Sequence, residues 1–408
     1  MGHRLTLFHI TQRSLWKTHR PRKEIIMNDR YLRPAGADLF RVLAVGMVGA
    51  FHFWQQSWVS APGLDFLMRS GGAWVDGMIL LSAFCLYLPY AHAWAQGKAF
   101  PGCRGFLQRR AVRILPSYYF AVLVSALVWM AAHRPDRDFW LDLGSHLLLI
   151  PTLVPQGYVY CRTNGALWTV GVLVLFYLLF PLLARAFYAW PLPVLAGLCA
   201  AQELYARCRV LPLQGVDYSM RFNQLPAFFG VIGLGFAAAQ AVALLAPKQT
   251  KRREVFFALA ALAGLGGALW VLRRIAYWQD GPHGQLVWRL PLTLCFAVCL
   301  LGLCLGPQLP GAKLWAFLGG LSYNFYIWHQ WLAVRVKYDL RIPPWQGDTP
   351  PNQLGDTGWM HTYLALVWAV GLGAAVLATY GLEKPAARWL RARLEGARSR
   401  KTADAAAL

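Results

Sequence analysis

Ten long apolar stretches are spread along this chain, and they constrain its fold more than any other feature. About 20 consecutive apolar residues cross the hydrocarbon core of a bilayer as a helix, because a helix satisfies its own backbone hydrogen bonds there. The composition agrees, since 57% of the 408 residues are hydrophobic, 14% are charged and the mean hydropathy is +0.38. We therefore predict an all-α fold, a polytopic membrane helical bundle of about ten transmembrane helices. The expected spans are 38–60, 73–93, 115–132, 166–188, 190–206, 225–246, 255–273, 288–306, 315–337 and 360–381.

The basic residues favour one side of this bundle. If the N-terminus lies in the cytoplasm, the inner loops and both termini carry 26 of the 40 Lys and Arg residues, and the outer loops, with Arg289 among them, carry 13. Because cytoplasmic loops collect Lys and Arg, we expect a multi-pass protein of the cell membrane with both termini cytoplasmic. The net charge of +22 then reflects topology and attraction to the anionic lipid bilayer, so no nucleic-acid partner is expected.

The bundle is expected to form one membrane domain, residues 38–390, because no internal or inverted repeat is visible. Residues 1–37 form a basic cytoplasmic segment without the apolar core of a signal peptide, and Met27 is an alternative start. Residues 391–408 have the composition of a solvated cytoplasmic tail. The eight cysteines form no CxxC pair, so we expect no metal site, and we considered a disulfide between Cys161 and Cys208.

Two ionisable residues, Arg41 and His52, lie eleven positions apart in the first apolar stretch. Charges inside a membrane are costly and are normally tolerated only where they face a cavity or a partner. At about 1.5 Å per residue, His52 lies roughly 16 Å and about three turns beyond Arg41, so both share nearly one helix face. We expect this face to line a polar pocket in which His52 acts as a general base towards a hydroxyl. A histidine that only bonds to a neighbouring helix explains this stretch equally well.

Arg110 and Arg113 precede the third apolar stretch in the segment "RRAVRILPSYY". Their i, i+3 spacing places both guanidinium groups on one side of a helix, where they could bind phosphate oxygens in pairs. Ordinary loop arginines on the cytoplasmic side would show the same pattern.

Other polar residues within or beside the apolar stretches are candidates for the same pocket. Asp76 could instead cap a helix at the outer end of the second span. The ninth stretch mixes polar and aromatic residues, which indicates either a cavity-lining helix or an aromatic belt at the membrane interface. The candidates are Asp76, Ser82, Trp168, Ser322, Asn324 and His329.

Six segments in order resemble the acyltransferase family 3 integral-membrane O-acyltransferases, and the likeness covers most of residues 30–395. They are the Arg41 and His52 pair, "WVDGMILLSAF" (74–84), the RxxR pattern of Arg110 and Arg113, "LWTVGVLVLFYLLFPLL" (167–183), "LGGLSYNFYIWHQ" (318–330) and "LEKPAARWL" (382–390). The resemblance implies transfer of an acyl group, usually acetyl, from cytoplasmic acyl-CoA to a hydroxyl of a glycan, a lipid-linked sugar or a secondary metabolite. It implies no permanently bound cofactor.

The resemblance also implies that His52 is catalytic and that Arg41, Arg110 and Arg113 support the site or bind the donor. It leaves open whether His52 acts as a general base or carries the acyl group as an acyl-imidazole. Family members usually have a glutamate where this chain has Leu173. Without it, Asp76, Glu203 or a water would have to substitute. A catalytically impaired relative that binds or passes a glycan or lipid is one alternative, and a proton-linked transporter that uses Arg41 and His52 is another.

Overall fold

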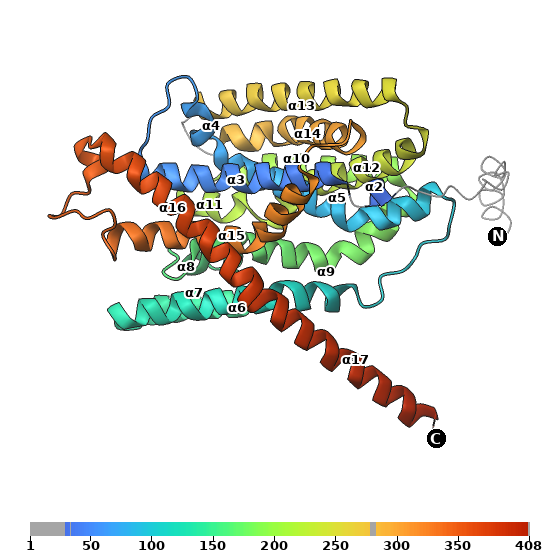
Figure 1. The fold of residues 1–408 in the computed structure, drawn as a ribbon. Coiled ribbons are helices and arrows are strands. Elements are labelled where there is room, and N and C mark those ends of the chain that lie inside the picture. The colour runs from blue at the N-terminus through green and yellow to red at the C-terminus, as the bar shows by residue number, and fades with distance from the viewer. Residues whose placement is uncertain (1–28, 33, 278–282, 407–408) are drawn as a thin grey trace.

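The computed structural model describes residues 29–32, 34–277 and 283–406, and this part of the chain is helical without any strand. Met27 and most of the expected N-terminal segment lie outside the described residues. Many of the long helices run roughly side by side along one direction (Figure 1). The all-α prediction is confirmed.

Each of the ten expected spans coincides with a long helix. These helices are α3 (Ala35–Ser57), α5 (Trp74–Ala95), α6 (Phe106–Ala132), α9 (Trp168–Ala189), α10 (Pro191–Tyr205), α12 (Phe229–Leu245), α13 (Lys251–Tyr277), α14 (His283–Leu305), α15 (Ala312–Tyr338) and α16 (Thr357–Leu377). Within the described residues, eight helices are long and apolar enough to cross a membrane, and α10 and α15 are not among them. Helix α10 has only 15 residues, whereas α15 has 27 but contains the polar residues of the ninth stretch.

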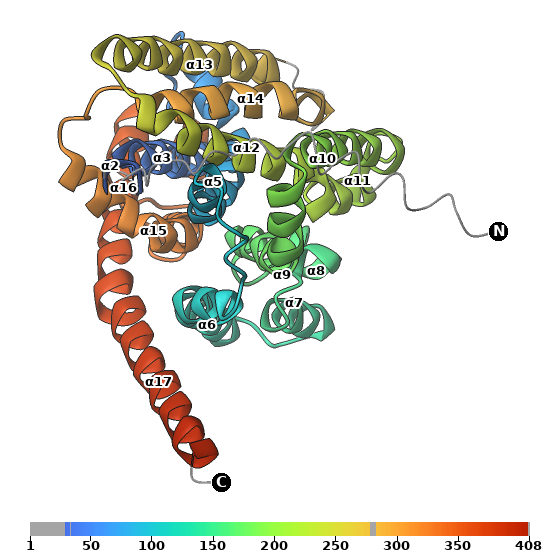
Figure 2. The same cartoon turned by 90° about the vertical axis from the view of Figure 1, so that its right-hand side faces the viewer.

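Short helices and single turns connect the long ones, and one further long helix follows them. The connecting elements are α2 (Asp29–Leu32), α4 (Asp65–Arg69), η1 (Gly71–Ala73), α7 (Arg137–Leu147), η2 (Pro151–Leu153), α8 (Pro155–Tyr158), η3 (Gly165–Leu167), η4 (Ala206–Val210), α11 (Gly215–Phe222), η5 (Leu225–Phe228), η6 (Ala246–Lys248), η7 (Pro351–Leu354) and η8 (Ala378–Glu383). Helix α17 (Lys384–Ala406) leaves the bundle near α15 and extends away from it (Figure 2). The domain boundary expected at residue 390 therefore lies inside a helix.

Helix α3 lies within the bundle, where it packs against α5, α14, α15 and α16. Small residues permit this close packing, as is usual between membrane helices. A Cβ atom on Gly36 would lie 2.2 Å from the Leu303 carbonyl oxygen of α14. Similarly, a Cβ atom on Gly235 of α12 would lie 2.6 Å from the Leu80 carbonyl oxygen of α5. Within this packing, Arg41 and His52 of α3 are only partly exposed.

Arg289 corrects one part of the sequence-based topology. It was counted with the outer loops, although it falls at the start of the expected span 288–306, and in the structure it lies inside α14 and is fully buried. Its Nε atom is 3.1 Å from Asp76 Oδ1, and Asp76 is also fully buried. The other guanidinium nitrogens donate to the carbonyl oxygens of Phe222 and Ala227 and to Asn223 Oδ1. A buried arginine requires such partners, because an unpaired charge in a protein interior is strongly destabilising.

All eight cysteines are free. The disulfide considered between Cys161 and Cys208 is therefore not formed, and that suggestion was wrong.

Candidate active site

The first and ninth expected spans meet at two histidines that are 277 residues apart in the sequence. His52 of α3 and His329 of α15 lie with His52 Nδ1 3.0 Å from His329 Nε2. His329 is 1% exposed, whereas His52 is partly exposed. The pair therefore consists of one accessible imidazole and one that is enclosed behind it.

The neighbours of the two rings determine where the protons lie. His329 Nδ1 is 2.7 Å from the Tyr326 carbonyl oxygen, which can only accept, so this nitrogen carries the proton and Nε2 carries a lone pair. His52 Nδ1 faces that lone pair and also the Val48 carbonyl oxygen at 3.0 Å, so it must be a donor. The remaining nitrogen, His52 Nε2, then has a free lone pair, which is the form that a general base or nucleophile requires.

Aromatic side chains hold the His329 ring in place. Phe325 stacks on it with ring centres 5.6 Å apart and an interplanar angle of 14°, and Phe53 meets it edge-on at 6.0 Å. Trp368 of α16 stacks in turn on Phe325 at 5.6 Å. This packing keeps His329 Nε2 directed at His52.

Arg41 lies eleven residues before His52 on α3. It lines a cavity of about 170 Å³ that extends between α3, α5, α6, α9 and α15. Arg41 forms an ion pair with Asp38 one turn earlier. The structure brings several predicted residues to this cavity, namely Arg41, Ser82, Arg110, Arg113 and Ser322. Arg41 of the first expected span and the RxxR pair, Arg110 and Arg113, therefore line the same cavity.

Tyr326 separates this cavity from the histidine pair. Its side chain lines the cavity, and its ring centre lies 5.4 Å from that of His329. Along α3 the cavity reaches Val45, and His52 lies seven residues or about 10 Å beyond. His329 therefore lies one side chain behind the lining of the cavity, and His52, which was expected to line the same pocket as Arg41, lies beyond its end.

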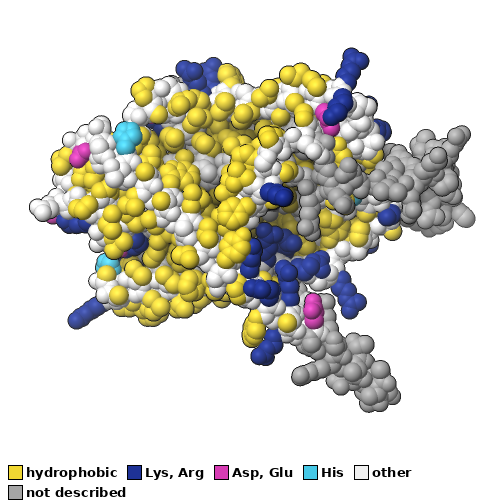
Figure 3. Space-filling model, viewed as in Figure 1, with side chains coloured by type: hydrophobic (Ala, Val, Ile, Leu, Met, Phe, Trp, Pro, Cys, Tyr) yellow, Lys and Arg dark blue, Asp and Glu magenta, His cyan; other side chains and the backbone are white. Residues whose placement is uncertain are grey.

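A wider cavity of about 720 Å³ adjoins the first one at Arg41, Arg110 and Arg113, and Arg109 and Asp38 also line it. Figure 3 shows Lys and Arg side chains gathered where α17 leaves the bundle. Anionic groups would be attracted to such a basic opening.

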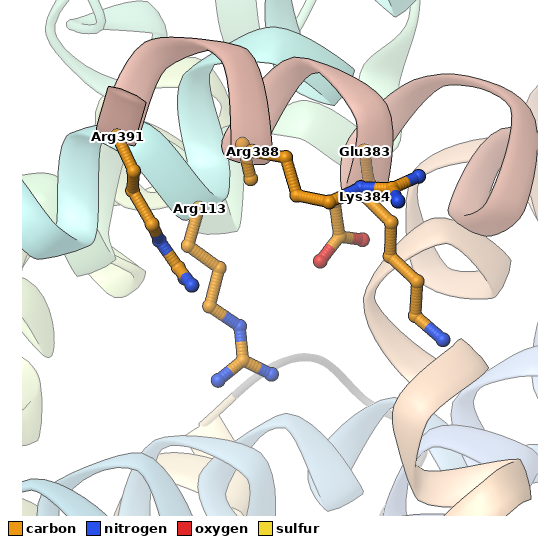
Figure 4. Close-up of a pocket in the computed structure, with 6 residues that line it drawn as sticks. Arg113, Glu383, Lys384, Arg388 and Arg391 are labelled. Carbon is orange, nitrogen blue, oxygen red and sulfur yellow. The ribbon is translucent and has the colours of Figure 1, made fainter. Parts of the chain in front are cut away.

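Helix α17 adds a further basic wall, which the sequence analysis missed. A cavity of about 440 Å³ lies between Arg113 of α6 and the side chains of Glu383, Lys384, Arg388 and Arg391 (Figure 4). Lys384, Arg388 and Arg391 follow an i, i+4, i+7 spacing and so share one helix face. That spacing was visible in "LEKPAARWL" and its continuation, and it is the signal that could have identified them.

Asn324 supports this wall and does not line a described cavity. Its Nδ2 atom donates to Glu383 Oε2 at 2.7 Å and to Thr379 Oγ1 at 2.9 Å. Both acceptors belong to the π-helical segment η8, so Asn324 ties α15 to the start of α17. This contact holds the Glu383 carboxylate beside the basic cavity.

Two other predicted residues lie away from the described cavities. Asp76 is held by Arg289, and Trp168 packs against Tyr158 with ring centres 5.6 Å apart. Glu203 does not substitute for the missing glutamate either, because it is paired with Arg207 at 3.7 Å on η4.

Leu173 lines the 170 Å³ cavity with an apolar side chain. Among the described residues, the carboxylates that line the basic openings are Asp38, Glu383 and Glu395.

Comparison with known proteins agrees with this architecture. The model of the acyltransferase 3 family, described as an acyltransferase domain, matches residues 35–380. No curated protein and no solved structure matches the chain significantly. The family match covers most of the chain and includes α3, α6 and α15, which carry the histidine pair and the RxxR arginines. The chain therefore belongs to the acyltransferase 3 family of membrane acyltransferases.

Proposed function

We propose that this protein transfers an acyl group, most simply acetyl, from acyl-CoA to a hydroxyl of a glycan, a lipid-linked sugar or a secondary metabolite. The observation that carries the proposal is the contact between His52 and His329, which Tyr326 separates from a basic cavity. The family membership supplies the reaction class, and the residues of this chain supply the roles.

The basic openings suit the phosphorylated end of acyl-CoA. Arg110 and Arg113 lie where the cavities join, and Arg388 and Arg391 face them from α17. Guanidinium groups bind phosphate oxygens through short, charge-assisted hydrogen bonds. With the phosphates held there, the pantetheine arm would extend past Arg41 and Ser82 towards Tyr326. We therefore propose that the donor enters on the side of α17, which we expect to be cytoplasmic.

His52 supplies the proton transfer in this scheme. As the acceptor hydroxyl oxygen forms a bond to the thioester carbon, its proton passes to His52 Nε2, and the carbon–sulfur bond then breaks. The proton subsequently passes to the departing CoA thiolate. In the alternative route, Nε2 attacks the thioester and carries the acyl group to the hydroxyl. In both routes the positive charge on His52 is stabilised through Nδ1–H by the Val48 carbonyl and His329 Nε2.

The test is transfer of radiolabelled acetyl from acetyl-CoA in native membranes that carry wild-type protein or His52→Gln. We expect His52→Gln to lower the rate by about 10²–10⁴-fold, the usual contribution of a general base. His361→Gln is the matched control, because His361 is an exposed histidine whose Nδ1 contacts only its own helix at Thr357. Equal transfer by wild type and His52→Gln, at equal amounts of folded protein, would refute the catalytic role of His52.

A catalytically impaired relative is the second candidate, and Leu173 is the observation that favours it. Leu173 presents an apolar side chain to the cavity where a family member would place a carboxylate. If the loss impairs this chain, Leu173→Glu should raise acetyl transfer above the wild-type rate. An unchanged or lower rate, with wild-type transfer well above that of His52→Gln, would reject the impaired relative.

A further inference from the structure

Helices α7 and α8 lie towards the end of the bundle away from the C-terminal end of α17 (Figure 1), and they hold a second polar cluster. Asp142 and His146 lie one turn apart on α7, and Cys161 lies in the segment that follows α8. One carboxylate oxygen, one ring nitrogen and the thiol sulfur lie within 4.8 Å of one another. These three groups take no part in the proposed acyl transfer.

The two oxygens of Asp142 have different surroundings. Oδ2 accepts hydrogen bonds from the backbone N–H groups of Arg162 and Thr163, both at 2.9 Å, and it lies 3.9 Å from Cys161 Sγ. Oδ1 lies 3.0 Å from His146 Nδ1, which also lies 3.1 Å from the Asp142 carbonyl oxygen. Because a carbonyl oxygen can only accept, Nδ1 carries the proton and Nε2 is the ring nitrogen with the lone pair that a metal requires. The backbone bonds fix the carboxylate against the segment that carries the cysteine, so the three side chains are pre-positioned by the fold.

One buried atom of this cluster, His146 Nε2, has no partner among the described residues. Asp142 Oδ1 makes only the 3.0 Å ion-pair contact with His146 Nδ1, and both side chains are 0% exposed. A buried polar atom without a partner costs about 1–3 kcal/mol, so an interior normally satisfies such atoms with protein, water or an ion. Here the unsatisfied atom is an imidazole nitrogen, and histidine is a common metal ligand.

The geometry points to a binding site for a transition-metal dication, most simply Zn²⁺, formed by Asp142, His146 and Cys161. Zinc takes thiolate sulfur at about 2.3 Å and imidazole nitrogen or carboxylate oxygen at about 2.0–2.2 Å, so its ligand atoms lie roughly 3–4 Å apart. The mixed sulfur, nitrogen and oxygen set favours zinc over Mg²⁺ and Ca²⁺, which prefer oxygen ligands alone.

Binding requires the Cys161 thiol to release its proton to the solvent as the sulfur–metal bond forms. Cys161 is partly exposed, which gives the ion a route to the site.

A metal bound at this site would also stabilise the position of His329 in the proposed active site. The segment that Asp142 holds continues to Asn164, whose Nδ2 donates to the Ile327 carbonyl oxygen at 2.9 Å. Ile327 lies two residues before His329 on α15. A metal that joins α7 to this segment would therefore stiffen the support of His329, although metal binding itself does not depend on acyl transfer.

The test is metal content of the full-length protein purified in detergent without chelator and then supplied with Zn²⁺. We expect about one equivalent in the wild type and in Cys208→Ser, which removes an exposed cysteine. His146→Gln and Cys161→Ser should lose it. Each of these changes removes a direct ligand of the metal. The affinity for Zn²⁺ should therefore fall by at least about 10–100-fold, which is the usual loss when a residue that only supports a ligand is replaced.

Cobalt substitution gives a second readout that a purely structural role would not produce. Co²⁺ bound to the wild type should show a thiolate-to-cobalt charge-transfer band, and Cys161→Ser should abolish it while Cys208→Ser retains it. Size exclusion and circular dichroism establish that each variant is folded. If the folded wild type binds no more Zn²⁺ or Co²⁺ than the folded double variant His146→Gln/Cys161→Ser, the site does not exist. Neither outcome depends on acetyl transfer.

Discussion

The buried pair of Asp76 and Arg289 should respond to mutation as a structural element and not as catalytic machinery. Both side chains are fully buried and lie 3.1 Å apart. At that distance, and with an effective dielectric constant of about 20, two unit charges attract by about 5 kcal/mol. Asp76→Asn removes this attraction but leaves the Arg289 guanidinium in place, with only neutral oxygen acceptors around it.

We therefore expect Asp76→Asn to lower the free energy of unfolding by about 3–5 kcal/mol, the usual cost of stranding one partner of a buried pair. Arg289→Met should be destabilising too, whereas the double variant Asp76→Asn/Arg289→Met should lose less than the sum of the two single losses. The assay is unfolding of detergent-purified protein, combined with acetyl transfer per folded molecule. If Asp76→Asn keeps wild-type stability but abolishes transfer, then Asp76 is catalytic and our placement of it is wrong.

Three further predictions test other parts of the structure. Arg391→Ala should raise the KM for acetyl-CoA by about tenfold or more, because a charge-assisted hydrogen bond contributes about 1.5–3 kcal/mol; an unchanged KM in initial-rate measurements would exclude α17 from donor binding. Gly36→Ala should destabilise the protein by about 1–3 kcal/mol because its Cβ would overlap the α14 backbone, whereas Gly46→Ala has open space and should not; equal melting temperatures would contradict this packing. In variants that retain a single cysteine, an impermeant maleimide should label the exposed Cys208 in intact cells and Cys103 only after permeabilisation; the reverse pattern would invert the expected topology.

The helical architecture could be predicted from the sequence because bilayer thickness sets the length of an apolar span. Arg289 was counted with the outer loops because a charge near the end of an apolar stretch is usually assigned to a loop. Only the structure shows that Asp76 of another helix pairs with it. Helix α10 has only 15 residues, fewer than a membrane span usually requires, although the expected span 190–206 matches its bounds to within one residue.

Part of the candidate site was also within reach of sequence reasoning. Arg41 and His52 share a helix face by their spacing alone, and the RxxR arginines do reach the cavity next to Arg41. Their relation to His329 could not be derived, because the two histidines are 277 residues apart and their contact depends on how α3 packs against α15. The cluster of Asp142, His146 and Cys161 was missed because it has no familiar metal-binding spacing, and the fold brings its members together.

The most direct measurement of the proposed mechanism is a double-mutant comparison of the histidine pair. Initial rates of acetyl transfer from acetyl-CoA would be measured for His52→Ala, His329→Ala and the double variant, at equal amounts of folded protein. Because His329 is expected to act only through His52, the double variant should be no slower than His52→Ala alone, and His329→Ala should itself be slower than wild type. Wild-type activity of His329→Ala, or a double variant whose loss equals the product of the two single losses, would contradict the proposed coupling.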